Sequence, residues 1–301
     1  MKATFAETNY QPLLFIQDKR FSIHRLQQYH LAISVGATSF RICCIDPTTS
    51  RCLLLAAYKL EAETITKRIK AIEQLFQELP WLAAKDWHAI TLCVENQQYT
   101  LVPEPLFQEE NTADYLKLAT AMGSNLAKHF VHLRLGIVVA FAIDPMLLAW
   151  FQIKYAQANF CIIHQASSII EGVWSYSKAQ KVKALPRLFA LTEPAHIHLT
   201  AIQQNNLLYY NRFSYSDSDE FLQYILMVIH TLGLDSHASE VTLGGSITKD
   251  SLAYRKACNY IRKVGLSNRP PYLNLSRAFR EKAITTNHFD LLHAYHCQKL
   301  H

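Results

Sequence analysis

The sequence predicts an α/β fold that is duplicated into two lobes, each built on a mixed sheet, with a small inserted subdomain. Segments typical of strands and helices alternate through the 301 residues, and 50% of these residues are hydrophobic, which is enough for a packed core. A strand-rich pattern near the start of the chain returns about 157 residues later. Two copies of one supersecondary unit indicate two related lobes with a cleft between them.

The first copy begins with three strands joined by short turns. Phe40, Ile42 and Cys44 alternate with their neighbours, and the apolar side chains between Thr64 and Leu79 recur at helical spacing until Pro80. The elements expected here are strands at 31–35, 40–44 and 52–60, a helix at 64–79 and a buried strand at 88–95.

An inserted region of about 96–143 interrupts this pattern. We expect a hairpin-like piece that ends at 102–105, a helix around 112–126 and two strands hinged at Gly136. The longest apolar stretch, 135–153, resembles a membrane span in length. Asp144 and Pro145 divide it, and an Asp N-cap before a Pro at the first helical position predicts a strand followed by a helix instead.

The second copy follows a strand at 159–164 and a helix at 166–179. Ala32–Ser34 corresponds to Ala190–Thr192 in this alignment. The elements expected are strands at 187–192, 197–201 and 207–215, a helix at 217–232 that ends at Gly233, and a strand at 241–243. The predicted domains are an N-terminal extension at 1–27, a first lobe at 28–184 that includes the inserted subdomain, and a second lobe at 185–301 with a C-terminal helix.

Composition narrows the classes of function. A net charge of +6 without a basic stripe argues against nucleic-acid binding, and seven cysteines without a CxxC pair indicate a cytoplasmic protein without disulfides. The N-terminus shows no signal peptide, and we expect no transmembrane segment. Only 8 of the 301 residues are glycine, whereas loops that cradle phosphate with backbone amides usually need more.

Three stretches resemble the actin-like ATPase superfamily, the fold of actin, sugar kinases and chaperone ATPase domains, which has a ribonuclease H-like core. Residues 34–40 resemble the first phosphate hairpin of that fold, and residues 192–197 occupy the place of the second. Residues 241–246, a strand that ends in Gly244 and Gly245, resemble its adenosine loop. The inserted subdomain is similar to that of PilM and of the cytoplasmic part of GspL, and residues 100–107 resemble an uncharacterised bacterial family with this fold.

The resemblance implies a nucleotide cleft, but two of its residues depart from the superfamily pattern. Active members carry an Asp in each phosphate hairpin that positions Mg²⁺, a cation that prefers carboxylate oxygen, and this chain has Ser34 and Thr192 there. The sequence therefore predicts a vestigial cleft with no catalytic residue and no metal site. Its expected lining is Ser34, Gly36, Ala37, Thr38, Thr192, Gly244, Gly245 and Ser246.

Two functions remain open at this point. The first is a non-catalytic scaffold or adaptor that binds protein partners, including components of a membrane-associated pilus or secretion assembly, with no cofactor and with scope for homo-oligomers. The alternative is an ATP-binding protein, or an active ATPase or kinase with Mg²⁺, that uses a relocated carboxylate such as Glu193 or Glu171. Alternation along a strand points Glu193 to the face opposite Thr192, and Pro194 removes an amide donor.

Other candidate groups have plain structural explanations. His196 and His198 suggest a metal site, but an exposed polar strand face explains them as well, and His293, His296 and Cys297 share one helical face that could suit zinc. Aromatic residues in 207–210 and 270–273 could anchor a partner, or could belong to half-buried strand faces.

Overall fold

The computed structural model describes residues 9–156, 158–179, 186–204, 206–235, 239–279 and 286–298. The chain divides into two compact units. The first contains the residues up to Ser168 together with those from Ala294 onward, and the second contains Ile169–His293. We describe each unit by itself.

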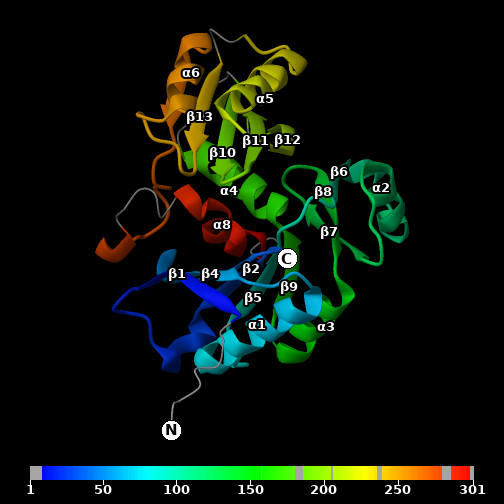
Figure 1. Cartoon of the computed structure of the whole chain (residues 1–301), viewed down its shortest axis with the longest axis vertical. Helices are drawn as coiled ribbons and strands as arrows, with labels where there is room; N and C mark the ends of the chain where they lie inside the picture. Colours follow the sequence, from blue (N-terminus) through cyan, green and yellow to red (C-terminus); the bar gives the residue numbers. More distant parts are fainter. Residues whose placement is uncertain are drawn as a thin grey trace. The chain divides into compact units, whose positions relative to one another are not determined.

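The first unit is built on a six-stranded mixed sheet with the order β1-β4-β3-β2-β5-β9 (Figure 1). Strands β1 to β4 pair antiparallel, whereas β5 and β9 continue parallel to β2. The strands are β1 (Tyr10–Gln17), β2 (His30–Val35), β3 (Ser39–Asp46), β4 (Arg51–Leu60), β5 (Ala89–Val94) and β9 (Phe160–His164).

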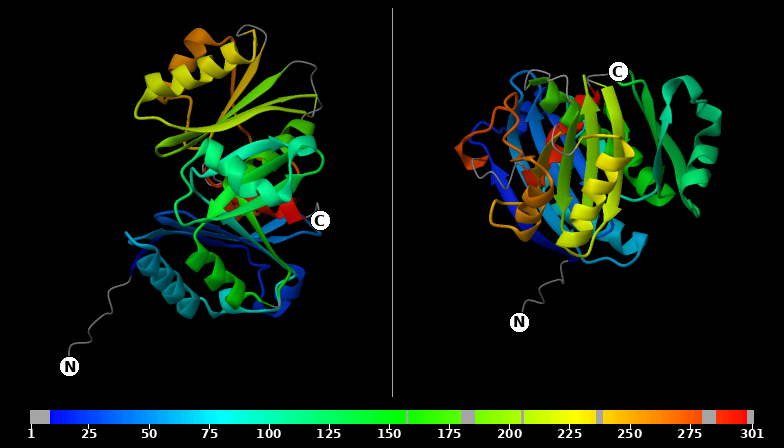
Figure 2. Two further views of the ribbon diagram at one scale, coloured as in Figure 1. Left: turned by 90° about the vertical axis from the view of Figure 1, so that its right-hand side faces the viewer. Right: turned by 90° about the horizontal axis from the view of Figure 1, so that it is seen from above.

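Two helices, α1 (Ile65–Glu78) and α3 (Pro145–Lys154), lie side by side on one face of this sheet (Figure 2). Phe76 of α1 packs edge to face against Trp150 of α3, with ring centroids 4.9 Å apart. Asp144 caps α3, because its Oδ1 accepts hydrogen bonds from the amides of Met146 and Leu147 at 2.8 and 3.1 Å. This cap confirms the strand-then-helix reading of the apolar stretch, and none of the described helices is long and apolar enough to cross a membrane.

The inserted subdomain is a three-stranded antiparallel sheet, ordered β6-β8-β7, with α2 (Thr112–Ala119) on one face. Its strands are β6 (Tyr99–Pro103), β7 (Leu126–His132) and β8 (Ile137–Ile143). Helix α2 is shorter than the predicted 112–126, because Thr120 is extended and Gly123 has φ +59°, so the chain turns before β7.

The second unit repeats the topology of the first. Its five-stranded sheet has the order β12-β11-β10-β13-β14, which matches β4-β3-β2-β5-β9 in both sequence order and strand direction. The strands are β10 (Arg187–Glu193), β11 (His196–Gln203), β12 (Asn206–Ser214), β13 (Glu240–Gly244) and β14 (Lys263–Leu266). The predicted duplication is therefore visible as matching sheets.

One face of this second sheet is covered by α5 (Ser218–Thr231) and α6 (Leu252–Tyr260), as Figure 2 shows. Leu188, Ala190, Ile197 and Leu199 from the sheet pack with Phe221 and Ile225 of α5 in one buried core. Gly233 follows the last turn of α5 with φ +61°, which confirms the predicted helix end.

The unit boundaries differ from the predicted domains. Residues 10–17 were assigned to an extension but form the edge strand β1, paired with β4. The first boundary falls within α4 (Gln165–Ala179), whose first turn continues β9 while Tyr176 packs against Phe189 of β10. The second falls within α8 (Phe289–Gln298), so the C-terminal helix belongs to both units.

Candidate functional site

The turn between β2 and β3 holds the predicted first hairpin. Ser34 is fully buried at the end of β2, and the exposed Ala37 and Thr38 form the turn. The amide of Gly36 donates to the carbonyl of Ser39 at 3.0 Å. A Cβ on Gly36 would lie 2.4 Å from the Ser39 hydroxyl and 2.7 Å from a carboxylate oxygen of Glu95, so a larger residue here would have to displace these two side chains.

Glu95 is the residue that the sequence analysis missed. It follows β5, and its amide donates to the carbonyl of Val35, which places it beside the hairpin. The Ser34 hydroxyl donates to its Oε1, and the Ser39 hydroxyl donates to its Oε2 at 2.8 Å. Its position in the sequence could have indicated a site residue, because a charged residue directly after a buried parallel strand lies at a strand end, and such ends commonly line ligand sites.

Arg41 neutralises this carboxylate. Its guanidinium forms an ion pair with Oε1 of Glu95, its Nε donates to the same oxygen at 3.0 Å, and its terminal nitrogen lies 3.3 Å from the Ser34 hydroxyl. The two side chains are only 11% and 14% exposed. Both carboxylate oxygens are thus occupied by protein donors, and the hairpin carries no net charge from this pair.

The turn between β10 and β11 holds the predicted second hairpin. Thr192 is buried, and its hydroxyl donates to the carbonyl of Gly244 at 2.9 Å. Glu193 points to the opposite strand face, as the alternation predicts, where its Oε2 lies 3.5 Å from Nε2 of His198 and 3.7 Å from the guanidinium of Arg212. The proposed relocated carboxylate is therefore engaged by two basic side chains of its own sheet.

His198 corrects another expectation. It is 1% exposed, and its Nδ1 is hydrogen-bonded to the hydroxyl of Tyr210 at 2.9 Å, so His196 and His198 do not form an exposed polar face. Burial lowers the pKa of His196, and the nearby charge of Arg212 lowers it further. Across the described residues, no group of three or more His, Cys, Asp or Glu side chains could hold a metal ion.

The adenosine-like turn is tightly packed. Gly245 has φ +86°, and a Cβ there would lie 2.1 Å from the carbonyl oxygen of Thr192, while a Cβ on Gly244 would lie 2.5 Å from the Leu191 side chain. The carbonyl of Gly245 accepts a hydrogen bond from the hydroxyl of Thr286 at 2.9 Å. Packing within the protein therefore accounts for both glycines, since the backbone of Thr192 lies against Gly245 and the side chain of Leu191 lies against Gly244.

A cavity of about 200 Å³ opens beside this turn, at the carboxyl ends of β13 and β14. Its lining is mainly apolar, and the polar residues among those that line it are Ser246, Thr248, Lys249, Ser267 and Thr286. Its volume is below the roughly 300 to 1,000 Å³ typical of small-molecule pockets, and none of the lining residues carries a carboxylate.

The candidate residues fall in both units. Ser34, Gly36, Ala37 and Thr38 belong to the first unit, whereas Thr192, Gly244, Gly245 and Ser246 belong to the second. Within the second unit the structure brings Thr192, Gly244 and Gly245 into direct contact. The nucleotide-bound Mg²⁺ that the superfamily implies does not fit these donors, because the hairpins offer hydroxyls and a carboxylate already paired with arginine.

The remaining candidates have structural roles or unremarkable surroundings. Glu171 is 2% exposed on α4. His293 is fully buried, and its Nδ1 donates to the carbonyl of Phe289 at 2.5 Å while its Nε2 lies 2.6 Å from the Tyr272 hydroxyl. Burial lowers the pKa of His293 to about 4. In the two aromatic segments Tyr210 is buried and Tyr272 is engaged by His293, which favours the half-buried interpretation.

Two solved structures with TM-scores above 0.5 share this architecture. A protein of actin-like ATPase fold and unknown function from Bacteroides thetaiotaomicron matches with TM-score 0.71 and 17% identity, over 82% of this chain and 93% of that chain. A chain of the PilM-PilN type IV pilus biogenesis complex matches with TM-score 0.63 and 10% identity, over 89% of this chain and 98% of that chain. The cytoplasmic domain of EpsL, an inner membrane component of the type II secretion system of Vibrio cholerae, matches with TM-score 0.41 and 8% identity, over 86% and 95% of the two chains.

At such low identity the structural likeness shows the fold alone, which is the actin-like ATPase fold. A search of curated protein sequences found no match. A family model described as protein of unknown function (DUF3822) matches residues 18–264, which is most of the chain. The chain therefore belongs to the DUF3822 family, and its two units carry the duplicated topology of the actin-like fold.

Proposed function

We propose that this protein is a non-catalytic, cytoplasmic scaffold or adaptor with an actin-like fold, which binds protein partners in an envelope assembly of the pilus or secretion type. One observation carries the proposal. The first hairpin is filled by the Arg41–Glu95 pair and two serine hydroxyls, in the place where a metal-orienting carboxylate would stand.

The chemistry of phosphoryl transfer explains why this observation matters. That reaction depends on positioning and on electrostatic neutralisation of charge on the transferred group, and Mg²⁺ provides much of both. In the first hairpin the carboxylate of Glu95 is already paired with Arg41. In the second hairpin the hydroxyl of Thr192 donates a hydrogen bond to the backbone carbonyl of Gly244. A metal ion would have to displace an ion pair that is largely shielded from water, which is costly.

The structural likeness to a chain of a PilM-PilN complex supports the choice of partner class. That protein shares the fold and is named for an assembly with another protein. For this chain we infer only a role in binding other proteins, because one fold hosts many functions.

A second candidate is nucleotide binding without hydrolysis, and the cavity beside Gly245 favours it. Its lining is mainly apolar and includes Ser246, Thr248 and Lys249, which could hold part of a nucleoside, and such binding would not need the missing carboxylates.

Isothermal titration calorimetry with ATP, with and without Mg²⁺, separates the candidates. A pure scaffold gives no binding heat in either titration, and a regulatory nucleotide site gives heat that does not depend on Mg²⁺. Ser246 lines the cavity and is exposed, so Ser246→Ala should leave the core unchanged. This variant should reduce the Mg²⁺-independent binding heat that a regulatory nucleotide site gives. Binding that requires Mg²⁺ would contradict both candidates.

A further inference from the structure

One stretch of the second unit, residues 249–269, carries a large surplus of positive charge. It holds six Lys and Arg residues and one acidic residue, Asp250, so its net charge is +5, whereas that of the whole chain is +6. The remaining 280 residues are nearly balanced, with 24 basic and 23 acidic residues. Helix α6, the edge strand β14 and the loops beside them carry this surplus.

The fold turns one side of α6 outward. The helix packs on the core of the second unit through Ala253 and the fully buried Ala257. Leu252, Arg255 and Asn259 follow one another at intervals of three and four positions, which places them together on a side of the helix away from that core. All three are exposed, and Leu252 is 53% exposed. The outer face of α6 therefore presents an arginine beside an exposed leucine.

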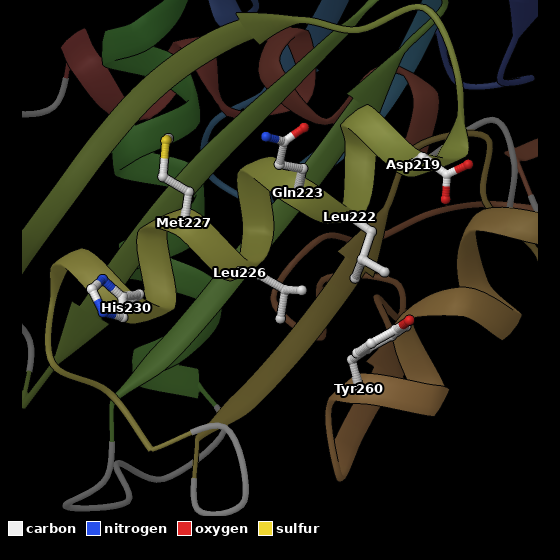
Figure 3. Close-up of a pocket in the computed structure, with 7 residues that line it drawn as sticks. All are labelled: Asp219, Leu222, Gln223, Leu226, Met227, His230 and Tyr260. Atoms are coloured by element: carbon white, nitrogen blue, oxygen red, sulfur yellow. The ribbon is translucent and has the colours of Figure 1, made fainter.

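A different side of α6 faces α5. The amine of Lys256 donates to Oδ1 of Asp219 at 2.6 Å, and Tyr260 and Leu226 line one cavity of about 460 Å³ between the two helices (Figure 3). The carboxylate of Asp219 thus meets Lys256, which lies on the side of the helix toward α5. Arg255, on the outer face, is not the cation that this carboxylate engages.

Three cations of the stretch are open to a partner. Lys249, Arg255 and Arg262 are exposed, and no hydrogen bond or ion pair joins their side chains to any other residue that the structure describes. Lys249 precedes α6 and Arg262 follows it, so the three cations are distributed along a helix roughly 14 Å long. Lys263 is not counted among them, because it lies opposite Glu240 in the strand register.

We propose that the outer face of α6, with Lys249 and Arg262 at its two ends, is a docking surface for an anionic lipid bilayer. Anionic headgroups complement its cations, and no ion pair within the described part of the protein has to break to free them. The exposed side chain of Leu252 can enter the boundary between headgroups and acyl chains, as apolar residues of interfacial helices do. This leucine favours a lipid surface over a nucleic acid or an acidic protein, since charge alone would serve those partners.

The number of cations sets the strength of binding. Each Lys or Arg near an anionic surface raises partitioning about fivefold, so three of them give a preference for anionic over neutral vesicles on the order of a hundredfold. Salt should weaken this binding, because the screening length falls from about 10 Å at 0.1 M to about 3 Å at 1 M. The proposal is independent of whether the chain binds nucleotide.

Sedimentation of the full chain with lipid vesicles tests the proposal. At about 0.1 M salt the chain should bind phosphatidylcholine vesicles that contain about 30% phosphatidylglycerol, bind pure phosphatidylcholine about a hundredfold less, and dissociate at about 1 M salt. Arg255→Gln combined with Arg262→Gln should weaken binding about 25-fold. The matched control, Lys67→Gln with Lys70→Gln, removes two exposed cations of α1 and the same net charge, and should leave binding unchanged.

A second readout separates lipid from other polyanions. Leu252→Ser should weaken vesicle binding several-fold, because it removes the apolar contact and keeps the charge. The wild-type chain should bind a DNA duplex or polyglutamate more weakly than the anionic vesicles, as measured by fluorescence anisotropy in the same buffer. Circular dichroism checks that every variant is folded. No binding to the anionic vesicles, an equal loss in the lysine control, no effect of Leu252→Ser, or tighter binding to DNA or polyglutamate would each overturn the proposal.

Discussion

Replacement of Arg41 is the most severe test of the ion pair between Arg41 and Glu95 at the first hairpin. Arg41→Met keeps the length of the side chain but leaves the carboxylate of Glu95, 14% exposed, with the hydroxyls of Ser34 and Ser39 as its side-chain donors among the residues that the structure describes. Breaking a fully buried pair in this way costs roughly 3 to 5 kcal/mol. Because both side chains retain some contact with water, we expect a loss of about 2 to 3 kcal/mol in the free energy of unfolding of the first unit.

The assay is urea unfolding followed by tryptophan fluorescence, because guanidinium would screen the ion pair. A loss of this size corresponds to a fall of roughly 5 to 10 °C in the thermal midpoint. The double variant Arg41→Met with Glu95→Gln has no unpaired charge and should recover more than half of the loss. Lys117→Met is the control, since its pair with Asp114 is about two-thirds exposed on both sides and should cost under about 0.5 kcal/mol. A loss in Arg41→Met no larger than in the control, or a double variant as unstable as the single one, would refute the reasoning.

Two further predictions concern the second unit. Gly245→Ala should destabilise it by about 3 kcal/mol, since the new methyl group would meet the Thr192 carbonyl at φ +86°, whereas Gly233→Ala, with φ +61° and open space, should cost only about 1 kcal/mol in the same urea assay. The folded-state pKa of His293, about 4, is lower than that of the unfolded chain, so the unfolded state takes up the proton more readily. Stability should therefore fall as the pH drops from about 6.5 to about 4, by up to roughly 3 kcal/mol, and His293→Gln should lose that part of the pH dependence; an unchanged pH profile would exclude the explanation.

Local pattern was sufficient for much of the fold. The strand at Phe40, Ile42 and Cys44, the cap at Asp144 and the glycine after α5 all depend on neighbours in sequence, and the structure has each of them, although β3 is buried on both of its faces. The duplication was visible for the same reason, because both copies repeat short segments in one order. The prediction of a helix as far as 126 failed where Gly123 adopts a positive φ that the apolar spacing does not reveal.

The contacts of the candidate site depend on strand order, which local pattern does not contain. Glu95 and Ser34 are 61 positions apart and meet only because β5 lies beside β2. His198 looked like part of a polar face because its neighbour in the alternation is His196. Its burial depends on Tyr210 from β12, which pairs with β11.

Phosphate release from ATP in the presence of Mg²⁺ is the measurement that tests the central claim most directly. The wild-type chain and Glu95→Gln should both release phosphate no faster than buffer, because Glu95 is held by Arg41 and the second hairpin has only Thr192 at the corresponding place. Turnover by the wild-type chain that is lost in Glu95→Gln would contradict the account and would identify Glu95 as a relocated catalytic carboxylate.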